Sequence, residues 1–265
     1  MIKIFNEDCR TTIKRFIRKN KRVNVILTSP PYNTALANGS AVNADKKDMR
    51  SRYDVFIDNM TNDQYIDFSV SLFNSFDSIL AKDGVILYNM SYSAVNPSLL
   101  WLVIASIIQS TPFMVADCIV WQKNNALPSN QNPNRLCRIC EFVFVFCRKD
   151  EALTFQCNKG QGRAVKATGQ QRWLSIPNLI KAPNNDNPTP KLNRATYSTS
   201  LCSQLLKIYA RPKDKVYDPF MGTGTTAVAC KYLGLTCYGS ELSANQCEYA
   251  LNRLDFKIAN SLFKK

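Results

Sequence analysis

The sequence contains no histidine among its 265 residues. Without an imidazole, Ser-His-Asp and Cys-His nucleophilic triads, HExxH metalloprotease sites and Cys₂His₂ zinc fingers are excluded. Long apolar runs are also missing, and no stretch approaches the roughly 20 apolar residues that cross a bilayer. The first ten residues, MIKIFNEDCR, hold acids and no apolar h-region, which predicts no signal peptide. We expect no membrane partner and a cytoplasmic, nucleoid-associated protein if bacterial or viral, or a nuclear one if eukaryotic.

Acidic residues are scarce, with 20 Asp and Glu against 34 Lys and Arg, so that the formal net charge is +14. A basic surface binds polyanions because it releases the counterions that condense on phosphates. A basic proteome would produce the same bias. The charge therefore favours nucleic acid as a partner without establishing it.

Ten cysteines are present, but their spacing is irregular. Cys137 and Cys140 form a CxxC that resembles half of a zinc site, and no second CxxC accompanies it. Free and mostly buried thiols are the better interpretation, because nothing in the sequence suggests secretion. No metal cofactor is expected.

Short apolar runs alternate with segments of helical periodicity, which predicts an α/β fold with a mostly parallel, doubly wound sheet and helices on both faces. Residues 34–60 are polar and charged and are interpreted as a mobile loop. Residues 151–195 are rich in Asn, Lys, Gln, Pro and Gly and are a candidate recognition region within one domain of residues 1–265. The expected strands cover 23–27, 85–88, 119–121, 142–146, 215–217 and 236–239, and the expected helices cover 61–80, 99–109, 201–209, 225–233 and 244–254.

A glycine-containing loop stands near the C-terminus, in VYDPFMGTGTT at residues 216–226. A strand leads into Gly222 and Gly224 and a helix follows, so that backbone can approach a ligand closely. Glu241 ends the next strand, where an acid can accept hydrogen bonds from both hydroxyls of a ribose. No GKS or GKT follows the glycines, which disfavours an ATP-hydrolysing P-loop. The pattern suits an adenosyl ligand.

A second motif, LTSPPYN at residues 27–33, follows the first apolar strand. Its two prolines fix the directions of the loop carbonyls. Ser29 and the carbonyl of Pro30 can accept hydrogen bonds from an amino group, and Tyr32 offers a face on which a base can stack. Such acceptors would stabilise the pyramidal nitrogen of an amino-methylation transition state. A plain proline-stiffened turn would explain the prolines, but not Ser29 and Tyr32 together.

The motifs SPPY and DPFMGTGTT on one chain resemble those of the DNA amino-methyltransferases, which act on adenine N6 or cytosine N4. The order, with the catalytic motif first, is that of the beta group. This resemblance implies a Rossmann-like methyltransferase fold, S-adenosyl-L-methionine as cofactor and flipping of the target base. It also places the target-recognition region within residues 151–195. The segment 191–198 lacks the His-Pro often found in the family, and Thr196 or Ser198 is expected to contact the cofactor instead.

The residue roles that follow from the motifs and the resemblance form three groups. The expected catalytic residues are Ser29, Pro30, Pro31 and Tyr32. The expected cofactor-binding residues are Asp8, Cys9, Asp218, Phe220, Gly222, Gly224, Thr225 and Glu241. The expected DNA contacts are Asn33, Lys46, Lys47, Arg50, Arg52, Lys123 and Arg135.

The target base is left open by the motifs. Ser29 is the residue more usual in cytosine-N4 enzymes, whereas Asn33 and the general layout resemble adenine enzymes of the beta group, and we lean to adenine N6. An RNA amino-methyltransferase and a non-catalytic DNA-binding subunit are more distant alternatives. Both motifs are intact, which favours catalysis on DNA. A homodimer and a cognate restriction enzyme are further partners that such a family allows.

Overall fold

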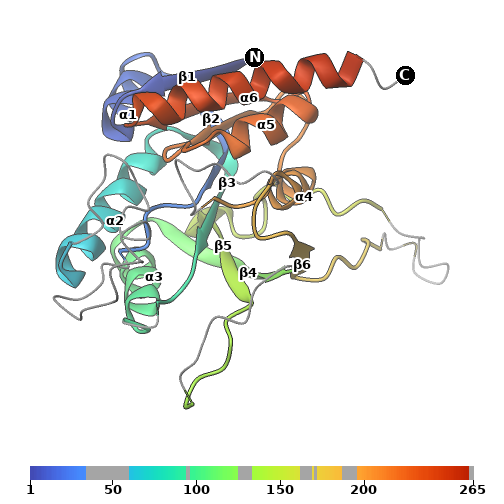
Figure 1. The fold of residues 1–265 in the computed structure, drawn as a ribbon. Helices are drawn as coiled ribbons and strands as arrows, with labels where there is room; N and C mark the ends of the chain where they lie inside the picture. The colour runs from blue at the N-terminus through green and yellow to red at the C-terminus, as the bar shows by residue number, and fades with distance from the viewer. Residues whose placement is uncertain are drawn as a thin grey trace.

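A computed structural model describes residues 1–33, 60–93, 96–124, 133–161, 169, 172–186 and 196–262, with side chains up to residue 255. Helices and strands alternate around one eight-stranded sheet, as the sequence predicts (Figure 1). In chain order the elements are β1 (Ile2–Asn6), α1 (Cys9–Arg18), β2 (Val23–Thr28), α2 (Asn62–Asp77), β3 (Leu80–Met90), α3 (Leu99–Ser110), β4 (Phe113–Lys123), β5 (Cys140–Arg148), the 3₁₀ helix η2 (Lys149–Glu151), β6 (Leu179–Ala182), α4 (Thr199–Tyr209), β7 (Lys215–Asp218), α5 (Thr225–Tyr232), β8 (Thr236–Glu241) and α6 (Ala244–Leu262).

The strands lie in the order β1-β8-β7-β2-β3-β5-β4-β6. All neighbours pair in parallel except for β5, which is antiparallel to both β3 and β4. The predicted mostly parallel sheet is therefore confirmed. Because β5 runs the other way, its first residues lie at the edge where the parallel strands end.

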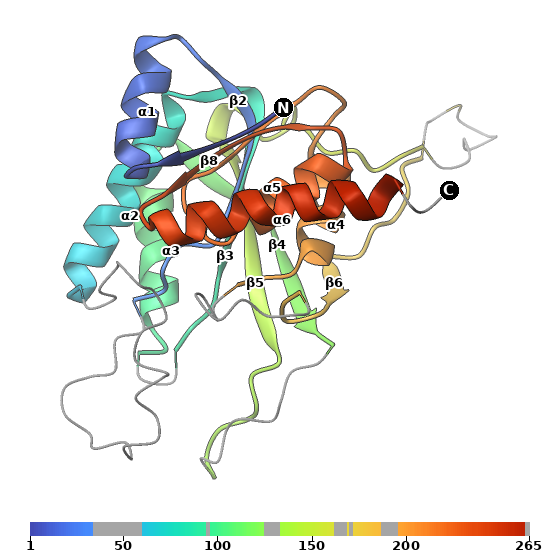
Figure 2. The same cartoon turned by 45° about the horizontal axis from the view of Figure 1, so that its top comes forward.

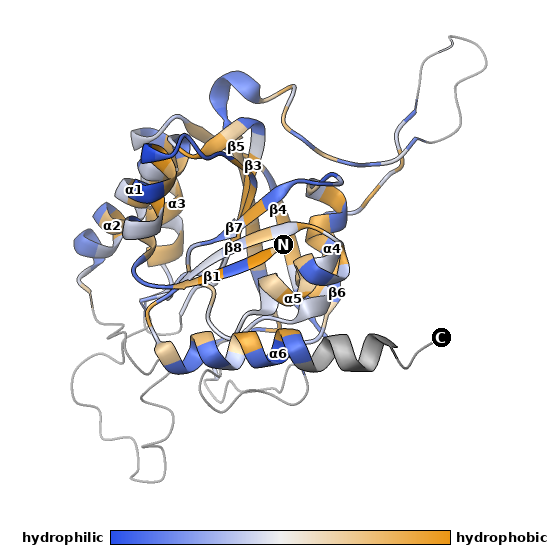
Figure 3. Cartoon of the chain, turned by 90° about the horizontal axis from the view of Figure 1, so that it is seen from above, coloured by the Kyte–Doolittle hydropathy of each residue, from blue (hydrophilic) through white to orange (hydrophobic). Residues whose placement is uncertain are grey.

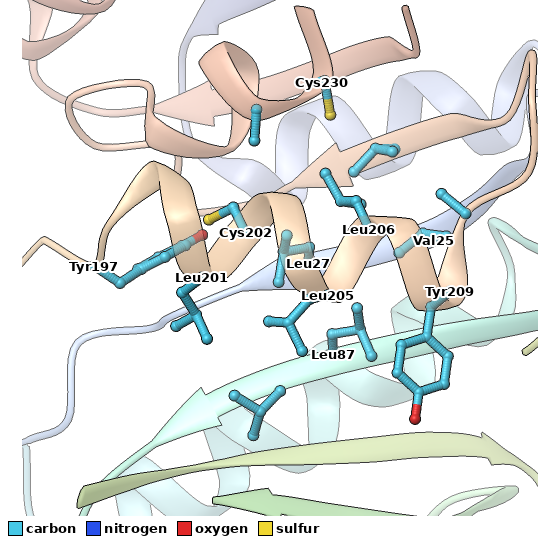
Figure 4. Packing of buried hydrophobic residues seen from close by; sticks show 14 of the residues in the cluster. Val25, Leu27, Leu87, Tyr197, Leu201, Cys202, Leu205, Leu206, Tyr209 and Cys230 are labelled. Carbon is cyan, nitrogen blue, oxygen red and sulfur yellow. The ribbon is translucent and has the colours of Figure 1, made fainter. Parts of the chain in front are cut away.

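Helices cover both faces of the sheet, with α1, α2 and α3 on one face and α4, α5 and α6 on the other (Figures 1 and 2). Alternate residues of the strands point to opposite faces, so that Val25 and Leu27 join one core and Val23 and Ile26 the other. The first core packs against α4 and α5, and Figure 4 shows Leu205 of α4 reaching toward the strands. The second core packs against α1, α2 and α3. Apolar colour in Figure 3 accordingly follows the strands and the inner sides of the helices.

Local signals explain several boundaries. Thr61 caps α2 with a capping box, since its hydroxyl accepts from the backbone N–H of Gln64 while the Gln64 side chain accepts from that of Thr61. The strand expected over 85–88 begins earlier, at Leu80, and β3 runs through Asp83 and Gly84 with an irregular register. A side chain at Gly84 would lie 2.9 Å from the Asn24 carbonyl, so a glycine is needed where the two strands meet.

Four elements were not predicted: β1, α1, η2 and β6. The last of these corrects the boundary of the recognition region, because Leu179–Ala182 lies inside residues 151–195 yet pairs with β4 in the core sheet. Ile180 and Ala182 are buried there. The predicted mobile loop of residues 34–60 falls outside the described residues, apart from Met60.

None of the helices in the described part of the chain is long and apolar enough to cross a bilayer. The described residues also contain no cluster of metal-ligating side chains. Cys137 of the CxxC is exposed and Cys140 half-buried, and both are free thiols.

Candidate active site

The functional motifs meet at one edge of the sheet. Strands β1, β2, β7 and β8 are parallel neighbours, so their carboxyl ends lie together, which is where open α/β sheets bind ligands. Asp8 follows β1, Ser29 follows β2, Asp218 ends β7 and Glu241 ends β8. Glu141 begins the antiparallel β5 and therefore reaches the same edge.

A cavity opens at this edge between the two motifs. Its walls combine acids, backbone of the glycine loop, aromatic rings and the start of the SPPY loop. The lining residues are Glu7, Asp8, Cys9, Arg10, Ser29, Pro31, Met60, Phe68, Thr196, Tyr197, Pro219, Phe220, Met221, Gly222, Thr223, Thr225, Ser240, Glu241, Leu242 and Gln246.

Glu241 is held in the wall of the cavity by backbone donors. One carboxylate oxygen accepts from the N–H of Gly222 at 2.8 Å, and the other accepts from the N–H of Ser243 at 2.9 Å. Each carboxylate oxygen has two lone pairs, so it can accept a further hydrogen bond from a hydroxyl group. The arrangement fixes Glu241 as an acceptor for a diol.

The two glycines of the loop have different roles. Gly222 lines the cavity, has a φ of 52° and donates its N–H to Glu241. Gly224 does not line it: its φ is 83°, and an added Cβ would lie 2.6 Å from the Cβ of Ala250 in α6. The lack of a side chain at Gly224 therefore serves helix packing, and binding of the ligand by Gly224 stays a prediction.

Asp8 and Cys9 lie in the cavity wall at the start of α1, where the Asp8 carboxylate caps the helix. A hydrogen bond from the Arg10 side chain holds the pKa of the Asp8 carboxyl below its usual value. Burial raises the pKa of the Cys9 thiol to about 12. Asp8 is therefore an anionic acceptor, and Cys9 a neutral surface for a ligand.

Asp218 is buried and does not line the cavity, and its expected contact with the cofactor stays a prediction. One oxygen accepts from the Thr28 hydroxyl at 2.8 Å and from the Phe220 N–H at 3.0 Å. The other accepts from the hydroxyls of Thr226 at 2.6 Å and Tyr197 at 3.2 Å. Burial raises the pKa of this carboxyl, and the hydrogen bonds oppose that rise. Asp218 thus joins the strand before SPPY to the glycine loop.

The SPPY loop belongs to a second polar network. The Tyr32 hydroxyl lies 2.9 Å from the Ser29 hydroxyl and donates to a carboxylate oxygen of Glu141 at 2.9 Å. The Asn89 amide nitrogen lies 2.6 Å from the Tyr32 hydroxyl and 2.9 Å from the same Glu141 oxygen. Lys123 pairs with the other Glu141 oxygen at 2.6 Å. Ser29 therefore sits between this network and the cavity.

Two of the predicted catalytic residues, Ser29 and Pro31, line the cavity, whereas Pro30 and Tyr32 lie behind it. The Pro31 carbonyl accepts from the Tyr65 hydroxyl at 2.5 Å, which anchors the loop to α2. Of the two residues expected to replace the family histidine, Thr196 lines the cavity.

Ser198 is instead the N-cap of α4 and accepts from the N–H of Leu201.

The predicted DNA contacts are placed unevenly. Arg135 is exposed, whereas Lys123 is ion-paired with Glu141 and its side chain is only 17% exposed. Contact of either residue with DNA stays a prediction. Asn33 is buried, and its amide donates to the carbonyl of Met60 at 2.8 Å. The four predicted contacts Lys46, Lys47, Arg50 and Arg52 lie outside the described residues.

Sequence reasoning did not assign roles to Asn89, Glu141 or Tyr197. A usable signal existed, because Asn89 and Glu141 are polar residues directly beside the apolar runs 85–88 and 142–146. Both side chains reach one edge of the sheet because β5 is antiparallel to β3. Neither apolar run indicates this strand direction.

Comparison with known proteins agrees with this geometry. The model of a DNA methylase family of N6 and N4 methyltransferases matches residues 23–252, which is most of the chain. The chain belongs to this DNA methylase family. The resemblance inferred from SPPY and DPFMGTGTT is therefore confirmed. Members of the family are S-adenosylmethionine-dependent methyltransferases, and the prediction of this cofactor is confirmed with the family.

Curated relatives are type II methyltransferases. M.HinfI of Haemophilus influenzae is 24% identical over 262 residues, which are 95% of this chain and 67% of M.HinfI. M.Cfr9I of Citrobacter freundii is 28% identical over 158 residues, which are 59% of this chain and 50% of M.Cfr9I. The match to M.Cfr9I thus covers only half of that relative.

Solved structures share the fold. The complex of M1.HpyAVI with SAM superposes with a TM-score of 0.61 at 23% identity, covering 96% of this chain and all of that one. The cytosine-N4-specific PvuII DNA methyltransferase gives a TM-score of 0.68 at 16% identity, covering 94% and 85% of the two chains. The predicted Rossmann-like methyltransferase fold is confirmed.

The residues of the cavity fit the family cofactor. Glu241 offers acceptors for a ribose diol, and Phe220 and Leu242 offer apolar surface beside them. Asp8 is a second anionic acceptor in the same wall. A sulfonium compound with a nucleoside end has the matching donors and cationic charge.

Proposed function

We propose that this protein transfers a methyl group from S-adenosylmethionine to the exocyclic amino nitrogen of a base in DNA. The observation that carries the proposal is the position of Ser29, which lines the same cavity as Gly222 and Glu241. The catalytic loop and the cofactor loop therefore share one space. The test is methyl transfer to DNA by the purified protein, with mass spectrometry of the digested nucleosides.

The proposed chemistry needs little from the protein beyond placement. When bound, S-adenosylmethionine supplies an electrophilic methyl group on sulfur. The protein must hold the amino nitrogen in line with that group, which supplies much of the rate enhancement. Ser29 and the Pro30 carbonyl accept hydrogen bonds from the amino group and favour its pyramidal form. The new N–C bond forms as the S–C bond breaks, and the nitrogen then loses a proton to solvent, so no histidine is required.

Because a stacked base cannot reach the cavity, the target nucleotide is expected to leave the helix at a cost of a few kcal/mol. We place it against Tyr32, behind the rim formed by Ser29 and Pro31. An RNA substrate would be recognised through the same amino group, and matched DNA and RNA oligonucleotides distinguish the two. A non-catalytic subunit would bind DNA without methylating either substrate.

We propose adenine N6 as the target, with cytosine N4 as the alternative. Support for adenine comes from the order and layout of the motifs, whereas Ser29 in the first motif position favours cytosine. Asn33 supports adenine less than the sequence suggested, because its side-chain amide donates to the Met60 carbonyl. Both bases carry an amino group beside a ring-nitrogen acceptor, so Ser29 can serve either. The modified nucleoside found by mass spectrometry decides between them.

We propose that residues 151–178 contain the target-recognition region of a single catalytic domain. The described parts of this segment run outside the sheet beside α4 and β6 (Figure 1). Exposed apolar side chains occur on it, with Trp173 at 60% and Leu174 at 52% exposure. Gln161 and Trp173 form an isolated antiparallel bridge. An extended, partly apolar surface segment suits contact with DNA.

The cofactor assignment gives a first prediction. Glu241→Ala should weaken S-adenosylmethionine binding by about 1.5–3 kcal/mol, the scale of hydrogen bonds to a charged group. Titration calorimetry measures the change, and Glu248→Ala, at an exposed position of α6, is the control. Undiminished affinity of the Glu241 variant would remove this residue from the cofactor site.

DNA binding gives a second prediction. Because the formal charge is +14, the observed affinity should fall steeply between about 50 and 200 mM salt, by roughly 10³-fold if six or more phosphates are neutralised. Fluorescence anisotropy with a labelled duplex measures the slope. A flat dependence would argue against an interface built on phosphates. A homodimer and a cognate restriction enzyme remain predictions.

A further inference from the structure

Two side chains of the SPPY loop and three side chains beside it form a continuous chain of polar contacts. We name this chain the hydroxyl relay; its members are Lys123, Glu141, Tyr32, Ser29 and Asn89. They come from four neighbouring elements, β4, β5, β3 and the loop after β2. Glu141 is 15% exposed at its side chain, Lys123 17%, and Asn89 is buried. The catalytic roles of Ser29 and Tyr32 do not explain why the Lys123–Glu141 ion pair lies next to them.

The direction of each hydrogen bond follows from the groups present. Lys123 can only donate, and the Glu141 carboxylate can only accept. The Tyr32 hydroxyl has one proton, which it donates to Glu141. Between Ser29 and Tyr32, separated by 2.9 Å, either hydroxyl could donate by distance alone. Because the Tyr32 proton is directed to Glu141, the Ser29 hydroxyl donates to Tyr32.

The same carboxylate orients Asn89. Its amide nitrogen faces Glu141 at 2.9 Å, and a flipped amide would place oxygen against carboxylate oxygen. In this orientation the Asn89 Oδ1 atom is buried and has no hydrogen-bond partner among the described residues. A buried acceptor without a donor costs about 1–3 kcal/mol, so an incoming donor is favoured there.

We propose that Glu141, held by Lys123, is a positioning residue that sets the direction of the relay and leaves Ser29 as a hydrogen-bond acceptor toward the cavity. The Ser29 oxygen directs its own proton to Tyr32 and accepts from the Asn89 amide nitrogen at 3.4 Å. Its second lone pair is left for the substrate amino group. A reversed relay would have Tyr32 donate to Ser29 and occupy the acceptor that the reaction needs. This inference rests on the proposed amino-methyltransferase function and extends it to two residues that do not touch the base.

Glu141→Gln tests the direction because it preserves shape and removes the obligate acceptor. Lys123 can only donate, so the amide oxygen of the introduced glutamine must face it. The amide NH₂ then faces Tyr32 and Asn89 and donates to the Tyr32 hydroxyl, which in turn donates to Ser29. We expect the single-turnover methyl-transfer rate at saturating DNA to fall by roughly 10- to 100-fold. Cofactor affinity by calorimetry and DNA affinity by anisotropy should remain within about twofold of wild type.

A double variant separates direction from packing. In Glu141→Gln with Lys123→Met, nothing holds the amide oxygen on the lysine side, so it can rotate to accept from Tyr32. The rate should then recover by about tenfold over Glu141→Gln alone. Glu151→Gln is the matched control, because Glu151 is equally buried and pairs with Arg148 at the opposite end of β5. That control should lower thermal stability and leave the rate unchanged.

The outcomes are distinct. A normal rate in Glu141→Gln, or a double variant as slow as the single one, overturns the relay while the proposed function stands. Wild-type protein that methylates neither DNA nor RNA overturns the proposed function itself. If Glu141→Gln does not fold, the double variant is compared with Lys123→Met alone, and a difference above about tenfold contradicts the relay.

Discussion

Replacing Asp218 with alanine is expected to destabilise the protein by about 3–5 kcal/mol, the cost of removing one partner from a buried network. Four donors converge on this carboxylate, from Thr28, Phe220, Thr226 and Tyr197. In the alanine variant each of these four donors stays buried and has lost its acceptor. Denaturant unfolding followed by circular dichroism measures the change.

Asp218→Asn is the informative control for this loss. The amide oxygen can still accept from Thr28 and the Phe220 N–H, and the amide nitrogen can donate to the hydroxyl oxygens of Thr226 and Tyr197, which can turn around. We expect most of the stability to be retained. Equal losses in the alanine and asparagine variants would show that the carboxylate charge, and not the number of hydrogen bonds, holds the two motifs together.

The sign of the pH effect follows from the burial of the same group. Burial raises the pKa of the Asp218 carboxyl in the folded state above its unfolded value. The folded state therefore retains the proton to higher pH, and the contribution of this group to stability falls as pH rises from the unfolded to the folded pKa. This part of the pH dependence should be absent from Asp218→Asn.

Local patterns were sufficient for the central parallel strands. The apolar runs at 23–27, 85–88 and 215–217 became β2, β3 and β7, because a buried parallel strand is apolar on both faces. Helix α2 begins directly after Thr61, because the Thr61 side chain caps it. These features depend on residues that are close in sequence, so they can be recognised from a single sequence.

Features that depend on tertiary pairing were missed. Strand β6 has only four residues in a polar segment, and its pairing with β4 decides that it is a strand. Lys123 is among the expected DNA contacts, but it forms an ion pair inside the protein. Its partner Glu141 lies 18 residues away and reaches it only across the β4–β5 pair. The roles of Gly224 and Asp218 likewise depend on Ala250 and Tyr197, which sequence spacing does not connect to them.

Tyr32→Ala is expected to lower the single-turnover rate of methyl transfer by on the order of 10³-fold. The alanine removes base stacking worth roughly 1–3 kcal/mol and the hydrogen bond that directs Ser29. Cofactor affinity should be unaffected, because Tyr32 does not line the cavity that contains Glu241. Calorimetry for the cofactor and quenched-flow assays for transfer measure the two effects separately.

Tyr32→Phe separates the two contributions, since it keeps the ring and removes only the hydroxyl. We expect a loss of roughly 10- to 100-fold, similar to that of Glu141→Gln. Combining Tyr32→Phe with Glu141→Gln should cost little more than either change alone, because both interrupt the same relay. Additive losses would place the two residues in separate roles. A Tyr32→Ala protein that methylates DNA at the wild-type rate would show that the base binds elsewhere, and 5-methylcytosine among the products would exclude attack by an amino nitrogen.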